Sequence, residues 1–364
     1  MARVWPHRSD GSGQAALHKV ATICTVAAVR LAAVSLLVAV SLGGCSGSPS
    51  PPASEPPVVD RECLSRSIDG CERRSLTTVP AADAGPGEDT LGAVPIEPSG
   101  LSAGDLCRQA LRVEPVAELD TELLPETSGA VYSRATAGRL YAHNDSGSFP
   151  RLHAIDGDSR VTHVWTIDSA LFDWEDIAIA GSTLFLADIG DDLHIRPTVR
   201  ILAVPEPPGE TATLSRAAVH PFTYAEGRLD AEAVLVDIDG TEAVVITKGV
   251  DFPSGIYRIP LQGGDGDATV LERVADFTVG EPVSGADLSA DGAVVAVRTP
   301  TRVLLFDRAP GADLAESLSG TPCEAPSAPE RQGEAIALHP DGRGYTTLSA
   351  RESTARHEFR VPIP

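Results

Sequence analysis

The sequence predicts an all-β protein, a β-propeller of five four-stranded blades. The first observation is a recurring motif, in which an acidic residue enters a short apolar strand. Its acids are Glu126, Glu175, Glu232 and Glu334, and Ser284 stands in the corresponding place of the remaining copy. The second is spacing, because copies recur at roughly 50 residues, a period typical of propeller blades. The third is an Asp-Gly pair after several of the first strands, which favours a two-residue hairpin.

The first three units each hold four strand-like segments. We expect strands of the first unit at 126–130, 139–143, 151–155 and 161–167. The second unit has them at 174–176, 183–188, 199–205 and 217–224. The third has them at 231–236, 242–247, 255–260 and 269–277. The hairpin pairs are Asp239-Gly240, Asp291-Gly292 and Asp341-Gly342. Third strands share an alternating pattern, which predicts strands with one face in a core.

The last two units are less regular. The fourth shows strands at 284–288, 293–299 and 302–308, but its outer strand is hard to place. The fifth has strands at 334–338, 344–348 and 358–363 and lacks an outer strand. We predict that the N-terminal strand 112–119 pairs with this last blade and closes the ring, because an open edge would expose unpaired backbone groups. Pro115 is tolerated on such an edge. The irregular fourth unit leaves six blades as the alternative.

The N-terminus has the features of a targeting segment. Basic residues precede an apolar run at 31–42, and Leu42-Gly43-Gly44-Cys45 resembles the lipobox of bacterial lipoproteins. The run is too short to cross a bilayer, which needs about 20 residues. We therefore expect residues 1–44 to be a signal peptide and Cys45 to be lipidated, which places the protein on the extracytoplasmic face of the cell membrane. The alternative is an uncleaved anchor that extends back to Val20, although Arg30 interrupts it.

Residues 45–104 are rich in Pro, Ser and Gly, and 105–364 form the expected propeller domain. The first of these stretches is expected to be a disordered tether, because it contains too little apolar sequence for a core. One small loop is expected where Cys63 and Cys71 pair. The alternative is a small independent disulfide domain.

Four cysteines remain once Cys24 in the signal segment and Cys45 are set aside. An even number in an exported chain predicts two disulfides, with three pairings open. The short separation of Cys63 and Cys71 favours a local pair, which leaves Cys107 with Cys323. Free thiols are the alternative, and no CxxC spacing indicates a metal site.

The chain is acidic, with a formal net charge of −22 over 364 residues. Such a charge repels nucleic-acid phosphates, so we expect no nucleic-acid partner. It also gains nothing from anionic headgroups, so contact with the membrane should depend on the lipid anchor. A small molecule or an envelope protein remains as a partner.

Chemistry is expected at one rim of the propeller. In an antiparallel blade, the start of the first strand and the end of the second lie on the same face. The repeated acids should therefore converge at the channel mouth with residues from the second-strand ends. The candidate rim residues are Glu126, His143, Asn144, Asp145, Glu175, Asp176, Asp188, Asp191, Glu232, Lys248, Asp287, Arg298 and Glu334.

Carboxylates gathered at one rim repel one another, and something must offset that repulsion. A hard cation such as Ca²⁺ suits a rim of oxygen atoms. Its candidate ligands are Glu126, Glu175, Asp188, Glu232 and Glu334. The alternative is structural: each glutamate accepts hydrogen bonds from backbone N–H groups of the next blade and so holds blade to blade. A residue that recurs in several blades suits either role.

Four stretches carry a resemblance to known proteins. They are Glu126-x-Ser128-Gly129, His143-Asn144-Asp145-Ser146-Gly147, Asp173-Trp174-Glu175-Asp176-Ile177-Ala178 and Ala187-Asp188-Ile189-Gly190-Asp191. Together they resemble secreted β-propeller lipoproteins of high-GC bacteria and, more distantly, phytase-like and esterase-like propellers. The resemblance implies the propeller fold. Some of the distant group bind calcium and split phosphate esters.

Three functions stay open at this point. The favoured one is a lipid-anchored binding module that recognises a ligand or partner at its acidic mouth. The second is a calcium-dependent hydrolase of phosphate esters, in which Lys248, Arg298 or Arg351 holds the phosphate. The third is a structural scaffold of the cell envelope. Neither a G-x-S-x-G nucleophile motif nor a P-loop occurs, so whether the protein is an enzyme is left open.

Overall fold

The computed structural model describes residues 99–147, 149–207, 209, 213–249, 253–330, 332–350 and 355–363. The expected signal peptide, Cys45 and the Cys63–Cys71 pair lie outside these residues, as does most of the expected tether. Among the described residues, no helix combines the length and apolar character needed to cross a bilayer.

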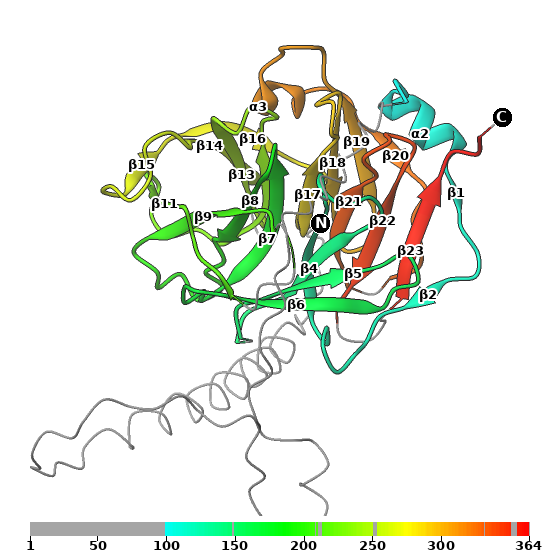
Figure 1. Cartoon of the computed structure of the whole chain (residues 1–364). Helices are drawn as coiled ribbons and strands as arrows, with labels where there is room; N and C mark the ends of the chain where they lie inside the picture. Colours follow the sequence, from blue (N-terminus) through cyan, green and yellow to red (C-terminus); the bar gives the residue numbers. More distant parts are fainter. Residues whose placement is uncertain are drawn as a thin grey trace, which may run out of the picture. The chain divides into compact units, whose positions relative to one another are not determined.

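The described chain folds into five sheets (Figure 1). Blade one has β3 (Thr127–Tyr132), β4 (Leu140–Asn144), β5 (Arg151–Ile155) and β6 (Val161–Ile167). Blade two has β7 (Trp174–Ala180), β8 (Thr183–Asp188), β9 (Val199–Pro205) and β11 (Ala218–Tyr224). Blade three has β12 (Ala231–Val236), β13 (Glu242–Thr247), β14 (Ser254–Pro260) and β16 (Arg273–Phe277). Blade four has β17 (Gly285–Leu288), β18 (Val294–Arg298), β19 (Val303–Asp307) and β20 (Cys323–Ala325). Blade five begins with β21 (Gly333–Leu338), β22 (Gly344–Ser349) and β23 (Ala355–Arg360).

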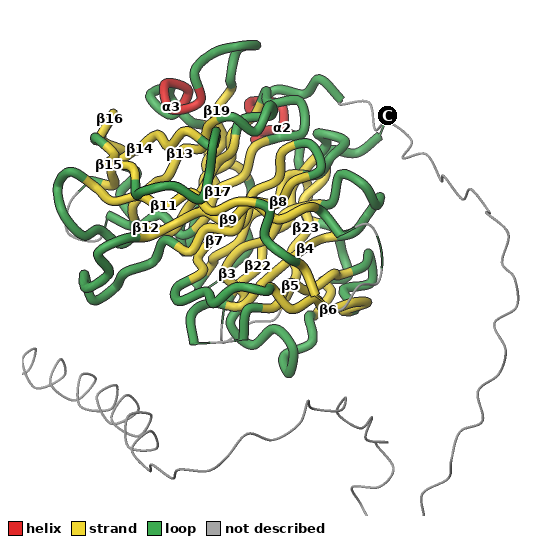
Figure 2. Tube along the Cα trace, turned by 60° about the vertical axis from the view of Figure 1, so that its left-hand side comes forward, coloured by secondary structure: helices red, strands yellow, loops and turns green. Residues whose placement is uncertain are grey.

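The first strand of each blade faces the centre. Each of these inner strands contacts the next one, and β21 contacts β3, so the five close into a ring. Neighbouring strands within a blade run antiparallel, and strands and loops make up nearly all of the described chain (Figure 2). The chain is a five-bladed β-propeller. The prediction of five blades is confirmed, and the alternative of six is excluded.

The ring closes through the N-terminal strand, as predicted. It pairs in two short pieces, β1 (Leu111–Arg112) and β2 (Ala117–Glu118), and both are antiparallel to β23. The segment between them includes Pro115, which lacks the N–H that a continuous ladder would need. Val113 still donates its amide to the Glu358 carbonyl at 2.8 Å. The N-terminal segment therefore supplies the outer edge that the last blade lacks.

A disulfide connects the same N-terminal segment to blade four. Cys107 lies on helix α2 (Ala103–Gln109), and Cys323 begins β20, the outer strand that was hard to place from sequence. Their Cα atoms are 6.2 Å apart, and the bond confirms the predicted pairing. The helix starts at a capping box formed by Ser102 and Asp105. Disulfide and helix together connect the closing strand to blade four.

Residues 99–104, which fell in the expected tether, are also packed against the propeller. The Ser99 hydroxyl donates to the Gly342 carbonyl at 2.9 Å. The Ala103 amide donates to the Asp307 carboxylate at 2.7 Å. The folded part of the chain therefore includes residues on the N-terminal side of 105.

Two short strands cross from one blade to the previous one, which the sequence did not predict. β10 (Thr213–Leu214) pairs in parallel with β6 of blade one. β15 (Thr269–Leu271) pairs in parallel with β11 of blade two. The expected single strand 269–277 is therefore two strands, because only its second half, β16, pairs with β14. These crossings join blades one, two and three by backbone hydrogen bonds.

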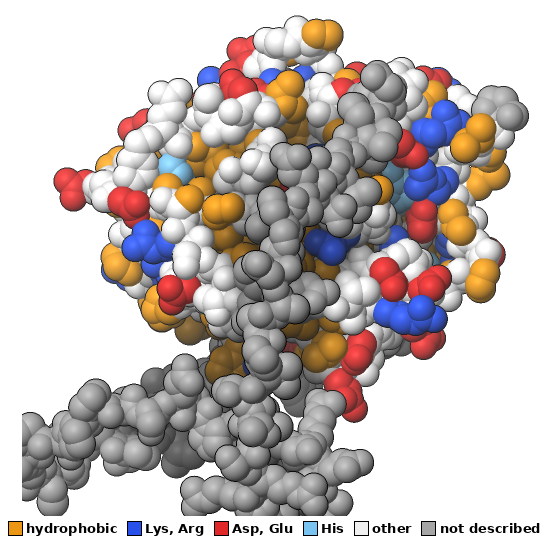
Figure 3. Space-filling view, in the orientation of Figure 1, with side chains coloured by type: hydrophobic (Ala, Val, Ile, Leu, Met, Phe, Trp, Pro, Cys, Tyr) orange, Lys and Arg blue, Asp and Glu red, His pale blue; other side chains and the backbone are white. Residues whose placement is uncertain are grey.

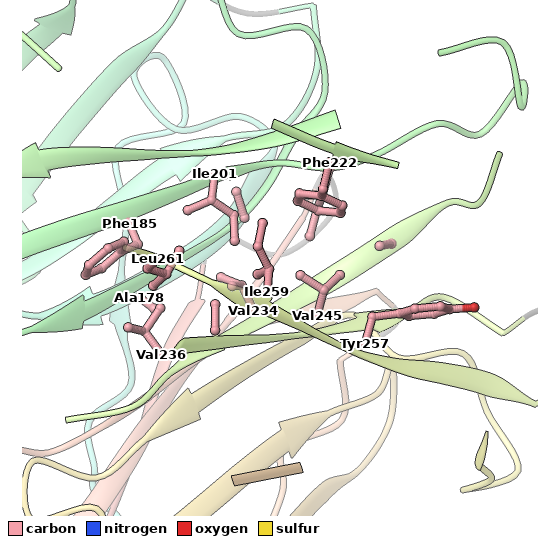
Figure 4. Packing of buried hydrophobic residues seen from close by; sticks show 14 of the residues in the cluster. Ala178, Phe185, Ile201, Phe222, Val234, Val236, Val245, Tyr257, Ile259 and Leu261 are labelled. Carbon is pink, nitrogen blue, oxygen red and sulfur yellow. The ribbon is translucent and has the colours of Figure 1, made fainter. Parts of the chain in front are cut away.

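The hydrophobic core lies between neighbouring blades. Between blades two and three, side chains such as Ile201, Val234 and Val245 are fully buried and interdigitate (Figure 4). Small residues bring the inner strands close together: a Cβ on Gly129 would lie 2.9 Å from the Cα of Asp176 in the next blade. Glycine at this position therefore allows β3 and β7 to approach each other closely.

Charged side chains on the outer surface are mixed in sign. The face in Figure 3 shows acidic and basic side chains interspersed among hydrophobic ones. Several form exposed pairs, such as Arg160 with Asp158 at 3.0 Å and Arg302 with Glu324 at 2.9 Å. Exposed pairs of this kind contribute less than about 1 kcal/mol each.

Candidate functional site

Three of the repeated glutamates sit at β-bulges at the start of inner strands. The strand register shifts at Glu175 in β7, at Glu232 in β12 and at Glu334 in β21. A bulge leaves one residue out of the ladder and re-aims its side chain. The recurring acid therefore marks the place where each inner strand departs from regular pairing at the mouth.

Five carboxylates meet at this mouth and form what we call the mouth cluster. Its members are Asp145, Asp173, Glu175, Asp230 and Glu232. They fall into two groups of three that share Glu175, and within each group one oxygen per residue lies within 4.8 Å of the others. Glu175 is 7% exposed and Glu232 is 5% exposed. Blades one, two and three all contribute to the cluster.

Main-chain hydrogen bonds hold the aspartates of the cluster in place. The Asp145 amide donates to the Glu126 carbonyl at 2.8 Å, and the Gly190 amide donates to the Asp173 carbonyl at 3.1 Å. The Lys248 amide donates to the Asp230 carbonyl at 3.0 Å. Each bond joins the end of a second strand to the entry of the first strand of the same blade. The cluster is thus set by sheet geometry and not by free loops.

Glycine at position 190 makes room for two of the carboxylates. A Cβ there would collide with Glu175 Oε1 and lie 2.6 Å from Asp173 Oδ2. The two carboxylates therefore rest against bare backbone, which any larger residue would prevent. The space beside Gly190 thus allows the Glu175 and Asp173 carboxylates to approach each other. These two groups repel each other unless a cation or a proton is bound.

Lys248 provides a positive charge at one end of the cluster. Its ammonium forms a short ion pair with Glu232 and lies 3.5 Å from Asp230 Oδ2 and 3.4 Å from Asp192 Oδ1. Burial alone would lower the pKa of this ammonium, but attraction to Glu232, Asp230 and Asp192 raises it above its ordinary value. Lys248 therefore stays charged and occupies the Asp230–Glu232 end.

Burial and crowding raise the pKa values of the acids at the mouth. Burial raises the pKa of Asp173 to about 6, and the charge of Asp145 adds to the rise. Burial raises the pKa of Glu232 to about 8, with Lys248 acting against it. Burial raises the pKa of Glu334 to about 7. Burial followed by repulsion from Glu232 raises the pKa of Glu175 well above its ordinary value. The mouth thus favours taking up a cation or a proton.

Asp176 and Asp287, beside the mouth, accept backbone amides of neighbouring blades. We call these two residues the channel acids. Asp176 accepts amide hydrogen bonds from Ile177 and Val234, both at 2.9 Å, and from Ala286 at 3.2 Å. Its carboxylate therefore joins blades two, three and four. Burial raises its pKa, against the three amides that lower it.

Asp287 plays the matching part between blades four and five. It accepts amide hydrogen bonds from Leu288 at 2.8 Å and from Leu338 at 2.7 Å. Burial raises its pKa to about 7. The blade-to-blade role that the sequence offered as an alternative for the glutamates is thus filled by the two channel acids.

Asp188, an expected cation ligand, is held away from the mouth cluster by two arginines. Its carboxylate pairs with Arg196 at 2.7 Å and with Arg200 at 2.9 Å, and it is fully buried. It also accepts the amides of Phe172 and Asp173 at 3.2 and 3.1 Å. Asp188 therefore shapes the backbone that presents Asp173.

Other expected rim residues also support the cluster from behind. Asp191 accepts the amides of Ile195 and Arg196, and its own amide donates to Asp230 at 2.7 Å. Asn144 accepts the Glu126 amide at 3.2 Å.

His143 and Arg298 are both buried. The His143 ring stacks on Trp174 with centroids 3.8 Å apart, and burial lowers its pKa to about 3. Arg298 forms a fully buried ion pair with Glu330. Arg351 lies outside the described residues. Neither His143 nor Arg298 offers an exposed group to a ligand.

Sequence reasoning did not single out Asp173 and Asp230 as site residues. Both stand two positions before a motif glutamate, so Asp-x-Glu occurs twice, and Gln332 takes the equivalent place before Glu334. In a regular strand, residues two apart share a face, and the bulge brings their carboxylates together. That repeated spacing was the signal available in the sequence.

Comparison with known proteins bears on the fold alone. No protein-family model and no curated protein matches the chain. Among solved structures, it is similar to a luciferin-regenerating enzyme, with 12% identity and a TM-score of 0.39 over 70% of this chain and 96% of that one. It is similar to Kuenenia stuttgartiensis hydrazine synthase, with 12% identity and a TM-score of 0.37 over 62% and 69%. It is also similar to the β-propeller domain of Myceliophteria thermophila Cps50 (Swd1), with 12% identity and a TM-score of 0.36 over 65% and 84%.

Proposed function

We propose that this chain is a lipid-anchored, extracytoplasmic binding propeller whose mouth cluster holds a divalent cation, with Ca²⁺ as the first choice. The observation that carries the proposal is the pair of overlapping three-carboxylate groups that share Glu175. Their donor atoms are all oxygens, which Ca²⁺ prefers. The anchoring part rests on the lipobox-like sequence that ends at Cys45.

Charge balance supports a bound cation. Two carboxylates at about 4 Å repel by roughly 4 kcal/mol at the effective dielectric of a protein surface. Five carboxylates meet here, and Lys248 pairs with the acids at one end. A divalent cation removes most of the remaining repulsion.

The cation is expected at the end formed by Asp145, Asp173 and Glu175, because Lys248 already occupies the Asp230–Glu232 end. Gly190 leaves the space in which Glu175 and Asp173 approach each other. Water and backbone carbonyls would complete the six to eight oxygen ligands typical of Ca²⁺. The cation would then present open positions to a ligand at the mouth.

Thermal melting tests cation binding. Purified full-length protein in detergent should melt at a higher temperature with Ca²⁺ than with EGTA, and isothermal titration should give one ion per chain. The stabilisation reaches about 2.7 kcal/mol when free Ca²⁺ is 100 times the Kd. Glu175→Gln should abolish the shift, whereas Glu272→Gln, an exposed acid outside the cluster, should keep it. No shift in the wild-type protein would refute the proposal.

Cell fractionation tests the anchor. Cys45→Ala should move the protein from the membrane to the soluble fraction, because the lipid is attached at that thiol. Cys24→Ala changes a cysteine in the signal segment and should leave the protein at the membrane. Retention of Cys45→Ala in the membrane would instead support the uncleaved anchor.

A further inference from the structure

A cavity of about 450 Å³ opens beside the mouth cluster, between blades two and three. Its walls come from the loop after β8, the segment before β12, the end of β13 and strands β14 and β16. Asp230 and Lys248 belong both to this wall and to the surroundings of the cluster. A molecule in the cavity would therefore lie at the Lys248 end of the cluster, across Asp230 from the end at which the cation is proposed.

The cavity wall carries charges of both signs, because three basic side chains stand among the acids Asp192, Glu226 and Asp230. Lys248, Arg228 and Arg273 all face it. Lys248 is the only lysine after residue 19. The Arg228 guanidinium bonds the His194 carbonyl through one nitrogen at 3.4 Å. The remaining guanidinium edges suit an oxyanion, which arginine binds through paired N–H groups.

Apolar groups complete the walls. Leu229 and Pro253 line the cavity, and so does Tyr257, whose hydroxyl donates to Glu226. Small-molecule sites typically combine such apolar walls with a few polar groups in a volume of roughly 300–1,000 Å³. The volume here lies within that range and fits a metabolite.

We infer that this cavity binds a small organic anion, whose carboxylate or phosphate group is held by the arginines beside the Lys248 end of the mouth cluster and whose body rests on the apolar wall. The inference rests on the proposed function for its cation. An oxyanion in the cavity and a cation at the other end of the cluster attract each other through space, so the ligand should bind better when Ca²⁺ is present.

Isothermal titration with three related probes tests the inference. Phenyl phosphate and phenylacetate carry the two candidate anions on one body, and benzyl alcohol is the neutral control. With Ca²⁺, at least one anion should bind full-length protein and the alcohol should not, and EGTA should weaken the anion at least tenfold. Tighter phenyl phosphate would identify a phosphate ester as the ligand, and tighter phenylacetate a carboxylate.

Arginine variants locate the bound anion. Arg228→Gln should weaken the anion about tenfold, the loss of one charge-assisted hydrogen bond, without changing the Ca²⁺-dependent melting shift. Arg216→Gln, an exposed arginine paired with Asp265 outside the cavity, should change neither.

Separate outcomes refute the inference and the proposed function. If Ca²⁺ raises the melting temperature but neither anion binds, the alcohol binds equally well, or Arg228→Gln has no effect, the cavity inference fails alone. Equal anion binding in EGTA would remove the link to the cation. If Ca²⁺ itself has no effect, the proposed function fails.

Discussion

Glu175 and Asp176 are neighbours in β7, both buried, yet their carboxylates face different surroundings. The Asp176 oxygens face backbone amides of three blades. The Glu175 oxygen faces other carboxylates, from Asp173 and Asp230 among others. Burial raises the pKa of both. The donors around a carboxylate, and not its burial, decide whether it holds the fold together or is available to a cation.

Asp287 and Glu232 show the same contrast between a carboxylate that accepts backbone amides and one that faces other charged side chains. Asp287 accepts amides within its own blade and from blade five, whereas Glu232 pairs with Lys248 and crowds Asp230. The channel acids should therefore contribute mainly to the free energy of unfolding, and the acids of the mouth cluster mainly to cation binding. Four experiments separate the two roles.

The largest expected effect comes from Asp176→Ala. The change leaves three buried amides without an acceptor, and each unsatisfied group costs about 1–3 kcal/mol. We expect a loss of about 4 kcal/mol or more in the free energy of unfolding, measured by urea denaturation in EGTA. Asp176→Asn keeps an acceptor and should lose less. A loss below about 1 kcal/mol for the alanine variant would show that these amides find other partners.

Lys248→Gln should have the next largest effect. It leaves Glu232 buried without its ammonium, which costs about 2 kcal/mol for a pair that is partly exposed. Because the Asp230–Glu232 end is then vacated, Ca²⁺ should restore the stability and titrate at two ions per chain. Arg216→Gln serves as the matched control. A stoichiometry that stays at one would argue against Lys248 occupying a second cation position.

The metal-free protein should lose stability as pH rises from about 6.5 to 8. Raised pKa values, about 7 for Glu334 and about 8 for Glu232, mean that the folded state holds protons that the unfolded state releases. Each such proton lowers stability by about 1.4 kcal/mol per pH unit. The lowered pKa values of His143 and His153 act oppositely, but only below their ordinary value of 6.5.

Denaturation in EGTA across this pH range provides the measurement. Ca²⁺ affinity should rise over the same interval, because the ligands must lose protons to bind the ion. Glu334→Gln should flatten part of the metal-free decline. Metal-free stability that increases toward pH 8 would contradict the assignment.

The smallest expected effect is a gain. Glu175→Gln removes a carboxyl whose pKa the crowded mouth raises, so proton uptake already relieves part of the repulsion, and the metal-free protein should become more stable by only about 1 kcal/mol. Asp176→Ala changes stability in the opposite direction at the adjacent position. Urea denaturation of both variants in EGTA measures the two opposite changes in the free energy of unfolding. A loss of stability for Glu175→Gln would contradict the proposed difference between the mouth cluster and the channel acids.

The architecture was readable from sequence because its signals are local and repeated. The motif glutamates and the Asp-Gly turns recur at blade spacing, and a missing outer strand in the last unit demanded the N-terminal one. The pairing of Cys107 with Cys323 followed from the short separation of the other two cysteines. The blades were predicted from patterns that recur along the chain. The closing strand was predicted because an open sheet edge would expose unpaired backbone groups.

The site was only partly readable, because its chemistry depends on which loops face one another. Asp188 resembles the mouth acids in sequence, but Arg196 and Arg200 reach it across a loop and neutralise it. No spacing rule predicts that contact. Strands β10 and β15 have two and three residues, too short for a periodic pattern, and they exist only because a neighbouring blade offers an edge.

The position of the Cys107–Cys323 bond has a mechanical consequence. Along the chain, Cys107 comes before β1, the strand that closes the ring through only two residues. Tension applied to the chain on the N-terminal side of Ser99 therefore passes through α2 into blade four at Cys323 before it reaches β1. A pull from that end first loads the hydrogen bonds of Ser99 and Ala103 and then the covalent bond, so the force reaches the two-residue strand β1 last.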